Sequence, residues 1–142
     1  MDVGAVRLAL TGVRGEVERI RYATHISPDA VAGLVREADA LDRQLERIQQ
    51  WLAGADGPTQ ARLRGSLGQV GHTIYVALDR VKQLLTFVHT ETYVQDKSDT
   101  IRRCSTELHE CVLLAEFTLN VFSLYVKAPL LRLVEQISAD FA

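Results

Sequence analysis

The stretch VAGLVREADALDRQLERIQQWL, residues 31–52, decides the fold class. Its apolar residues recur at alternating spacings of three and four, so they form one stripe along an α-helix. The residues of this stripe are Val31, Leu34, Ala38, Leu41, Leu45, Ile48 and Leu52. Charged residues such as Arg43 and Glu46 fall outside it. The stretch therefore predicts an amphipathic helix that packs against other helices.

Helix start and stop signals flank this stretch. Before it, Ser27 offers a capping side chain, Pro28 suits the first helical position and Asp29 complements the helix dipole. After it, the turn cluster Gly54–Thr59 contains two glycines and a proline, which favour a chain reversal and a new helix. The helix is expected to run from about residue 28 to residue 52.

The same periodicity extends to both sides. Residues 3–20, 59–88 and 100–126 repeat it, with a reversal expected near residues 95–97 and a cap at Ser98 or Asp99. Beyond Pro129 the apolar positions continue to Phe141, which predicts a short fifth helix. Short turns favour antiparallel neighbours. The chain, residues 1–142, is therefore predicted to be one all-α domain, an up-and-down antiparallel four-helix bundle with a short fifth C-terminal helix.

The segment CVLLAEFTLNVFSLYV, residues 111–126, is apolar around most of its circumference. Such a helix is buried on several sides or spans a membrane. Sixteen residues rise about 24 Å and include Glu116, whereas a span needs roughly 20 apolar residues. Burial is the preferred interpretation, and the surplus apolar surface predicts a protein partner or self-association. The candidate interface residues are Val112, Leu113, Phe117, Val121, Leu124, Leu130, Leu131 and Val134.

Composition excludes some functions. Sixteen basic and 18 acidic residues give a net charge of −2, so the basic field that nucleic acids require is missing and no nucleic-acid partner is expected. Arg7 and Arg14 interrupt the apolar residues at the start, unlike a signal peptide, so a cytoplasmic location is expected. Cys104 and Cys111 would lie about 10 Å apart along a helix, beyond disulfide reach.

Patterns that carry catalysis or bind cofactors are missing from the sequence. Glu-x-x-His and His-x-x-x-His pairs, which place two metal ligands on one helix face, do not occur. The glycine-rich residues 65–71 follow no strand and lack the phosphate-loop pattern. Cys104 and Cys111 fall on or near an apolar stripe, which is a poor setting for a nucleophile. The chain is predicted to be non-enzymatic, with no metal or cofactor.

One resemblance covers residues 29–126. It is carried by Leu63-x-x-x-Leu67, Leu78-x-x-Val81-x-x-x-Leu85 and Ile101-x-x-Cys104-x-x-x-Leu108-x-x-Cys111, followed by the segment from Phe117 to Phe122. This layout resembles the N-terminal four-helix bundles of mixed-lineage-kinase-like pseudokinases, fungal HeLo-type proteins and related plant modules. The resemblance implies a regulatory bundle in cell-death or immune signalling, placed before a kinase-like or nucleotide-binding domain of a longer chain.

Two alternatives to a protein-interaction module stay open. The resemblance also implies a membrane-acting bundle, peripheral on activation, whose candidate contacts with anionic headgroups are Arg7, Arg14, Arg19 and Arg21. In addition, the segment Tyr75–Asp79 is similar to the YxxxD pattern of actinobacterial helical-hairpin secretion substrates, which implies a small secreted-type bacterial protein. The protein-interaction module is the favoured hypothesis, because the surplus apolar surface needs a cover.

Overall fold

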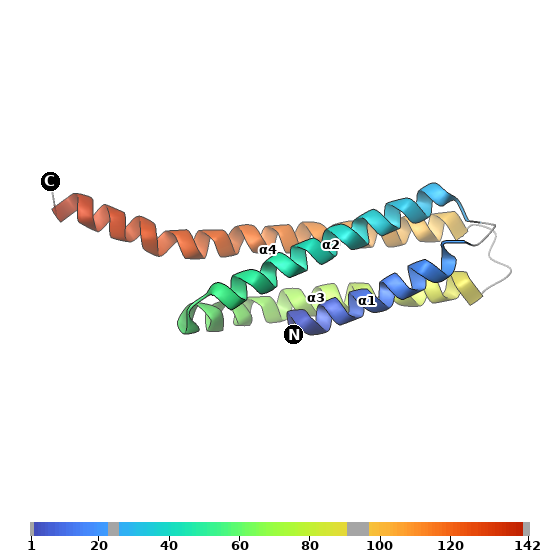
Figure 1. Ribbon diagram of the computed structural model, residues 1–142, viewed down its shortest axis with the longest axis horizontal. Coiled ribbons are helices and arrows are strands. Elements are labelled where there is room, and N and C mark those ends of the chain that lie inside the picture. Colours follow the sequence, from blue (N-terminus) through green and yellow to red (C-terminus); the bar gives the residue numbers. More distant parts are fainter. Residues whose placement is uncertain (1, 23–25, 91–96, 141–142) are drawn as a thin grey trace.

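The computed structural model describes residues 2–22, 26–90 and 97–140, and within them every side chain except those at 125–136 and 138. These residues form four helices: α1 (Val3–Ile20), α2 (Pro28–Gly54), α3 (Gly57–Thr90) and α4 (Lys97–Asp140). The helices pack lengthwise into an elongated bundle (Figure 1). The all-α four-helix bundle predicted from the sequence is confirmed, and the described ranges contain no strand.

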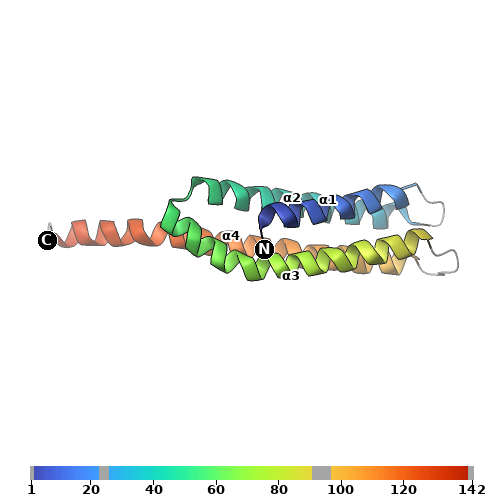
Figure 2. The ribbon, with the colours of Figure 1, turned by 90° about the horizontal axis from the view of Figure 1, so that it is seen from below.

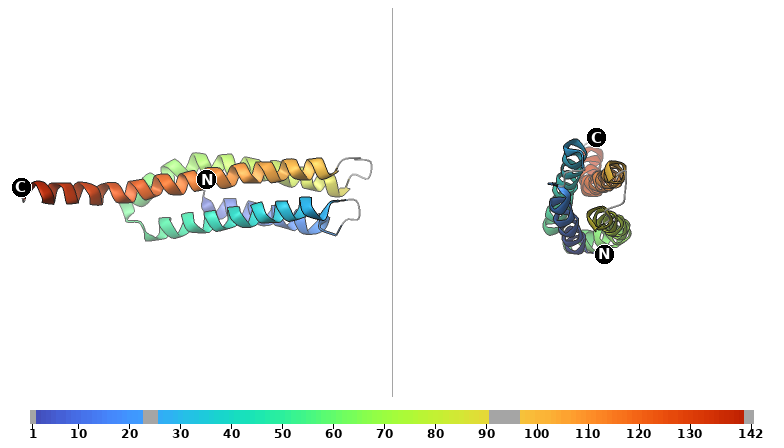
Figure 3. Two further views of the ribbon diagram at one scale, coloured as in Figure 1. Left: turned by 90° about the horizontal axis from the view of Figure 1, so that it is seen from above. Right: turned by 90° about the vertical axis from the view of Figure 1, so that its right-hand side faces the viewer.

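The helices occupy the four corners of the bundle in an order that differs from their order in the chain. α1 packs on α2 and α3, α4 packs on the same two helices, and α2 and α3 lie on a diagonal (Figure 3). Directions alternate along the chain as predicted. However, α1 and α3 are parallel neighbours, as are α2 and α4 (Figure 1). A short turn reverses the chain direction, but it does not decide which corner the next helix takes.

The predicted apolar stripes form the core. In α1 the buried apolar residues follow the stripe without exception: Val3, Val6, Leu10, Val13, Val17 and Ile20. In α2 the stripe from Val31 to Ile48 is buried, and Leu52 is partly buried at its end. Each large apolar side chain that is fully buried contributes about 1.5–3 kcal/mol to stability. The spacing of apolar residues therefore fixes which side of each helix faces inward.

The side chain that caps a helix start is not the one predicted. Ser27 precedes α2 as expected, but its side chain makes no capping hydrogen bond. The capping side chain is instead Asp56, whose Oδ1 accepts a hydrogen bond from the Thr59 backbone N–H at 2.8 Å. Hydrogen bonds from the side chain and the backbone N–H of Thr59 lower the pKa of the Asp56 carboxyl. Asp56, which lies two residues after the end of α2, thus caps the start of α3 at Gly57.

The last helix is longer than predicted. α4 begins at Lys97, although residues 95 and 96 of the expected reversal lie outside the described residues. The expected fifth helix is helical but continuous with the fourth, because the helical backbone passes through Pro129. An internal proline removes one hydrogen bond and costs about 3 kcal/mol, yet a helix can kink there and continue. The end of α4 therefore extends beyond the other three helices (Figures 1 and 2).

Two glycines inside helices predict a gain in stability. Gly15 in α1 and Gly65 in α3 are exposed, and a Cβ atom at either position would meet nothing within 4 Å. Alanine at either site should raise the free energy of unfolding by about 0.5–1 kcal/mol, because glycine in a helix interior costs that much. Chemical denaturation measures the gain. Gly54→Ala, at the last residue of α2, is the control, and an equal gain there would contradict the explanation.

Candidate interaction surface

Four large apolar side chains of α4 are exposed among those described, and all but Ile137 lie on one face of the helix. Leu113 is 50% exposed, Phe117 is 65% exposed and Leu124 is 66% exposed. Their spacings of four and seven residues place them on one face of the helix, and we call these three residues the α4 stripe. The opposite face of α4 is buried in the core through Cys111, Ala115, Leu119 and Phe122. The α4 stripe therefore lies on the side turned away from the bundle.

The structure divides the eight candidate interface residues into four groups. Leu113, Phe117 and Leu124 are exposed, Val121 beside them is partly buried, and Val112 lies in the core at 5% exposure. The side chains of the remaining three fall outside the described residues: Leu130, Leu131 and Val134. Val112 is therefore a packing residue rather than free surface. The interface role of the exposed residues stays a prediction.

Polar contacts join α4 to α2 close to the stripe. Gln44 Nε2 donates a hydrogen bond to Glu116 Oε1 at 3.5 Å. His109 Nδ1 lies 3.1 Å from Glu37 Oε2. Exposed pairs of this kind contribute at most about 1 kcal/mol each. They nevertheless occupy the α2 side of α4 with contacts inside the chain, and the α4 stripe lies outside these contacts.

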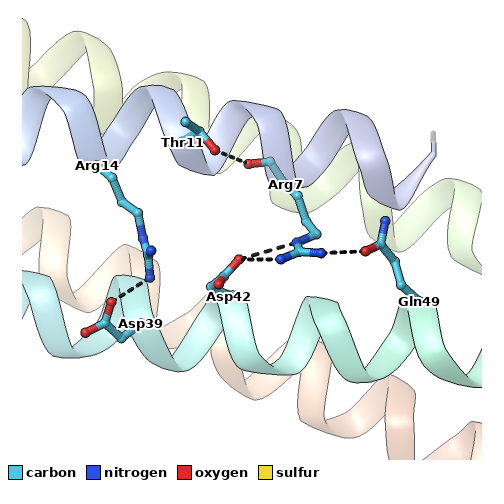
Figure 4. Close-up of polar contacts among 6 residues, drawn as sticks. All are labelled: Arg7, Thr11, Arg14, Asp39, Asp42 and Gln49. Carbon is cyan, nitrogen blue, oxygen red and sulfur yellow. Dashed lines mark hydrogen bonds and ion pairs between the residues drawn. The ribbon is translucent and has the colours of Figure 1, made fainter.

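Two arginines of α1 reach across to α2 (Figure 4). The Arg7 guanidinium lies 3.3 Å from Asp42 Oδ1, and its NH1 group donates a hydrogen bond to Gln49 Oε1 at 2.6 Å. Arg14 NH2 lies 2.5 Å from Asp39 Oδ1. All three contacts join residues of different helices and are partly buried. Arg7 and Arg14 therefore act as polar ties that hold α1 on α2.

The other two arginines, Arg19 at the end of α1 and Arg21 just after it, pair with glutamates of α1. Arg19 NH1 lies 3.3 Å from Glu16 Oε1, and Arg21 NH1 lies 3.0 Å from Glu18 Oε1. Both pairs are one helical turn apart, where oppositely charged side chains meet. Each of the four arginines predicted to contact anionic headgroups thus has an acidic partner in this conformation. Their role at a membrane stays a prediction.

The two cysteines belong to the core. Cys104 and Cys111 are buried free thiols. Burial, reinforced by the negative charge of Glu107, raises the pKa of Cys104 from 9.0 to about 12 and that of Cys111 to about 11. A thiol reacts as its thiolate, so neither side chain is primed as a nucleophile at neutral pH. Their packing role agrees with their place on the apolar stripe.

The described part of the chain offers neither a metal site nor a membrane-spanning helix. No group of three or more His, Cys, Asp or Glu side chains there is arranged to hold a metal ion. Within the same residues, no helix combines the length and the apolar character that crossing a membrane requires. The two faces of the long α4 differ, because one packs in the core and the other carries the α4 stripe.

The structure contains a groove between α1 and α3 that the sequence did not predict. It has a volume of about 330 Å³ and is lined by Ala5, Leu8, Ala9, Gly12, Tyr75, Leu78, Asp79 and Lys82. Leu8 is 73% exposed beside it. One signal was available, because Leu8 is a large apolar residue that lies outside the α1 stripe. The pairing of α1 with α3 as parallel neighbours is a tertiary feature that helical periodicity does not contain.

Comparisons with known proteins found no match among protein-family models, curated proteins or solved structures. The resemblance to the pseudokinase and HeLo-type bundles and the similarity of Tyr75–Asp79 to the YxxxD pattern are therefore untested and stay predictions. The proposed function therefore rests on the exposed surfaces of the bundle.

Proposed function

We propose that this chain is a non-enzymatic protein-interaction module whose α4 stripe binds a helix of a partner protein. The observation that carries the proposal is the exposure of Leu113, Phe117 and Leu124 on one helical face. A single exposed apolar side chain is ordinary, whereas a row of them is typical of interaction sites. Burying a leucine or a phenylalanine contributes about 1.5–3 kcal/mol, so a partner that covers all three gains substantial free energy.

The shape of the α4 stripe favours a helical partner. The stripe follows the axis of one helix, and a second helix lying along it can place apolar residues between its side chains as in a coiled coil. Glu110 and Glu116 are exposed next to the stripe. Their negative charge favours a partner helix with lysine or arginine beside its apolar face, because complementary charges at an interface rim steer association.

Site-specific photo-crosslinking tests this proposal in the cells that produce the protein. A photo-reactive amino acid at position 117 should give a discrete adduct with another protein, because the stripe is in contact with its partner. The matched control is position 106, where an exposed threonine lies 11 residues earlier on the same face of α4. Equal adducts at both positions, or no adduct at either, would contradict the proposal.

A second variant separates contact from proximity. Leu124→Asp in the chain that carries the probe at position 117 should abolish the adduct, since a carboxylate in the interface is left without a partner. Leu124 is 66% exposed, so the variant should keep the helical circular dichroism of the parent. An adduct that persists at full yield would show that the α4 stripe does not provide the binding energy.

Membrane action is the competing hypothesis, and vesicle leakage distinguishes it. It receives less support, because Arg7 and Arg14 already have partners on α2 that they would have to leave. Vesicles of phosphatidylcholine and phosphatidylserine should keep an enclosed dye when the purified chain is added. Leakage that disappears when Arg7, Arg14, Arg19 and Arg21 are all replaced by glutamine would instead favour membrane action over the protein-interaction proposal.

A further inference from the structure

The residues on the two sides of the groove between α1 and α3 lie at matching heights along the two helices. A Cβ atom on Gly12 would lie 3.5 Å from Lys82 Nζ, so these two residues lie side by side. The α1 residues of the groove are at positions 5, 8, 9 and 12, and the α3 residues are at 75, 78, 79 and 82, a constant offset of 70. Because α1 and α3 are parallel neighbours, each α1 residue lies level with its α3 counterpart.

The groove carries both a protrusion and a hollow. Leu8 is 73% exposed, more than Leu113 or Leu124 of the α4 stripe. Its neighbours on α1 in the groove are the small residues Ala5, Ala9 and Gly12. Leu8 therefore protrudes beside a strip of small residues, one end of which, at Gly12, lies against the Lys82 side chain. The apolar surface of Leu8 remains in water unless another molecule supplies a hole for it.

The groove also carries both signs of charge. Asp79 and Lys82 are exposed and lie three residues apart on α3. A two-fold axis that passes between their levels would set Asp79 of one chain opposite Lys82 of a second copy, and the reverse pair would form at the same time. The same axis sets Ala9 opposite Gly12 of the second copy, so Leu8 of each chain lies about one residue's rise from the level of Gly12 in the other.

We infer that the α1–α3 groove binds a second copy of this chain and forms a two-fold symmetric homodimer. A two-fold interface must be complementary to itself, and one axis through this groove sets Asp79 opposite Lys82 and Leu8 near Gly12 and the Lys82 side chain of the second copy. A small ligand is disfavoured, because the polar side chains of the groove, Tyr75, Asp79 and Lys82, are all exposed and leave the buried floor apolar. The homodimer is independent of the proposed function, because none of the residues that line the groove lies on α4.

Measurement of the mass in solution tests the homodimer. The wild-type chain should be a dimer by sedimentation equilibrium, and Leu8→Asp should be a folded monomer, because Leu8 is not part of the core. The matched control is Leu113→Asp in the α4 stripe, which should remain a dimer. A wild-type chain that stays monomeric up to millimolar concentration, or a dimer that is lost in Leu113→Asp and kept in Leu8→Asp, would overturn the inference.

Charge reversal tests the register of the two copies. Asp79→Lys and Lys82→Asp should each raise the dimer dissociation constant roughly tenfold or more, because each places like charges opposite one another. The double variant exchanges the two charges and should restore dimerisation to near the wild-type level. A double variant that dimerises as weakly as either single variant, or single variants that match the wild type, would overturn the proposed pairing.

Discussion

Replacement of Phe122 by alanine should lower the free energy of unfolding by about 3–5 kcal/mol. Phe122 is 1% exposed and is among the largest fully buried side chains of the molecule. The loss combines the lost burial of the ring with the cavity that remains, because the helices packed around it cannot close it fully. Urea denaturation followed by circular dichroism measures the change. A loss of this size would consume a large part of the 5–15 kcal/mol typical of folded domains.

The control for this prediction lies five residues earlier on the same helix. Phe117 is 65% exposed, so Phe117→Ala should change the free energy of unfolding by at most about 0.5 kcal/mol. The two substitutions remove the same atoms and have the same effect on helix propensity. Similar losses in both variants would mean that the two faces of α4 are not distinguished as described, and the α4 stripe would then be part of a core.

The second large effect concerns the chemical reactivity of the cysteines. Cys104 should react with a thiol reagent about a thousandfold more slowly in the folded chain than in the unfolded chain at neutral pH. The reason is that burial raises its pKa from 9.0 to about 12, which lowers the thiolate fraction by that factor. Cys111, with a pKa of about 11, should be slowed about a hundredfold. Mass spectrometry of pulse-labelled protein measures both rates, and equal labelling of folded and urea-unfolded chains would refute the burial.

The raised thiol pKa values also predict how stability depends on pH. Below pH 9 both thiols are protonated in the folded and the unfolded chain, and their contribution to stability is fully present. As the pH rises above 9, the unfolded chain loses these protons first, so folding becomes less favourable until the folded pKa values of about 11 and about 12 are passed. The variant with both cysteines replaced by alanine should lose less stability over this range.

The helices were predictable because their apolar stripes are sharply separated from polar residues. The stripe of residues 3–20 matches α1, and Pro28 marks the start of α2 as expected. The capping side chains were less predictable. Ser27 and Asp56 stand at similar places before a proline-containing helix start, yet only Asp56 makes a capping hydrogen bond. Periodicity thus determines the helix and its inner face, but it does not determine which candidate side chain caps the helix.

The candidate surfaces were less predictable for two physical reasons. Residues 111–126 are apolar on nearly every side, so the sequence offers no contrast to separate the buried Val112 from the exposed Leu113. The α1–α3 groove joins positions 70 residues apart, and its existence depends on the diagonal placement of α2 and α3. Which corner each helix occupies follows from the packing of all four helices together.

The helical backbone of α4 continues beyond the core, so this part of the helix is a spacer whose length and turn set where its end lies. Between Phe122, its last core residue among the described side chains, and Asp140 the helix rises about 27 Å. Each residue in this span also turns the helix by about 100°. Deletion of a single residue would therefore swing the tip of α4 to another side of the bundle. Deletion of seven would shorten the spacer by about 10 Å and return the tip to nearly the same bearing.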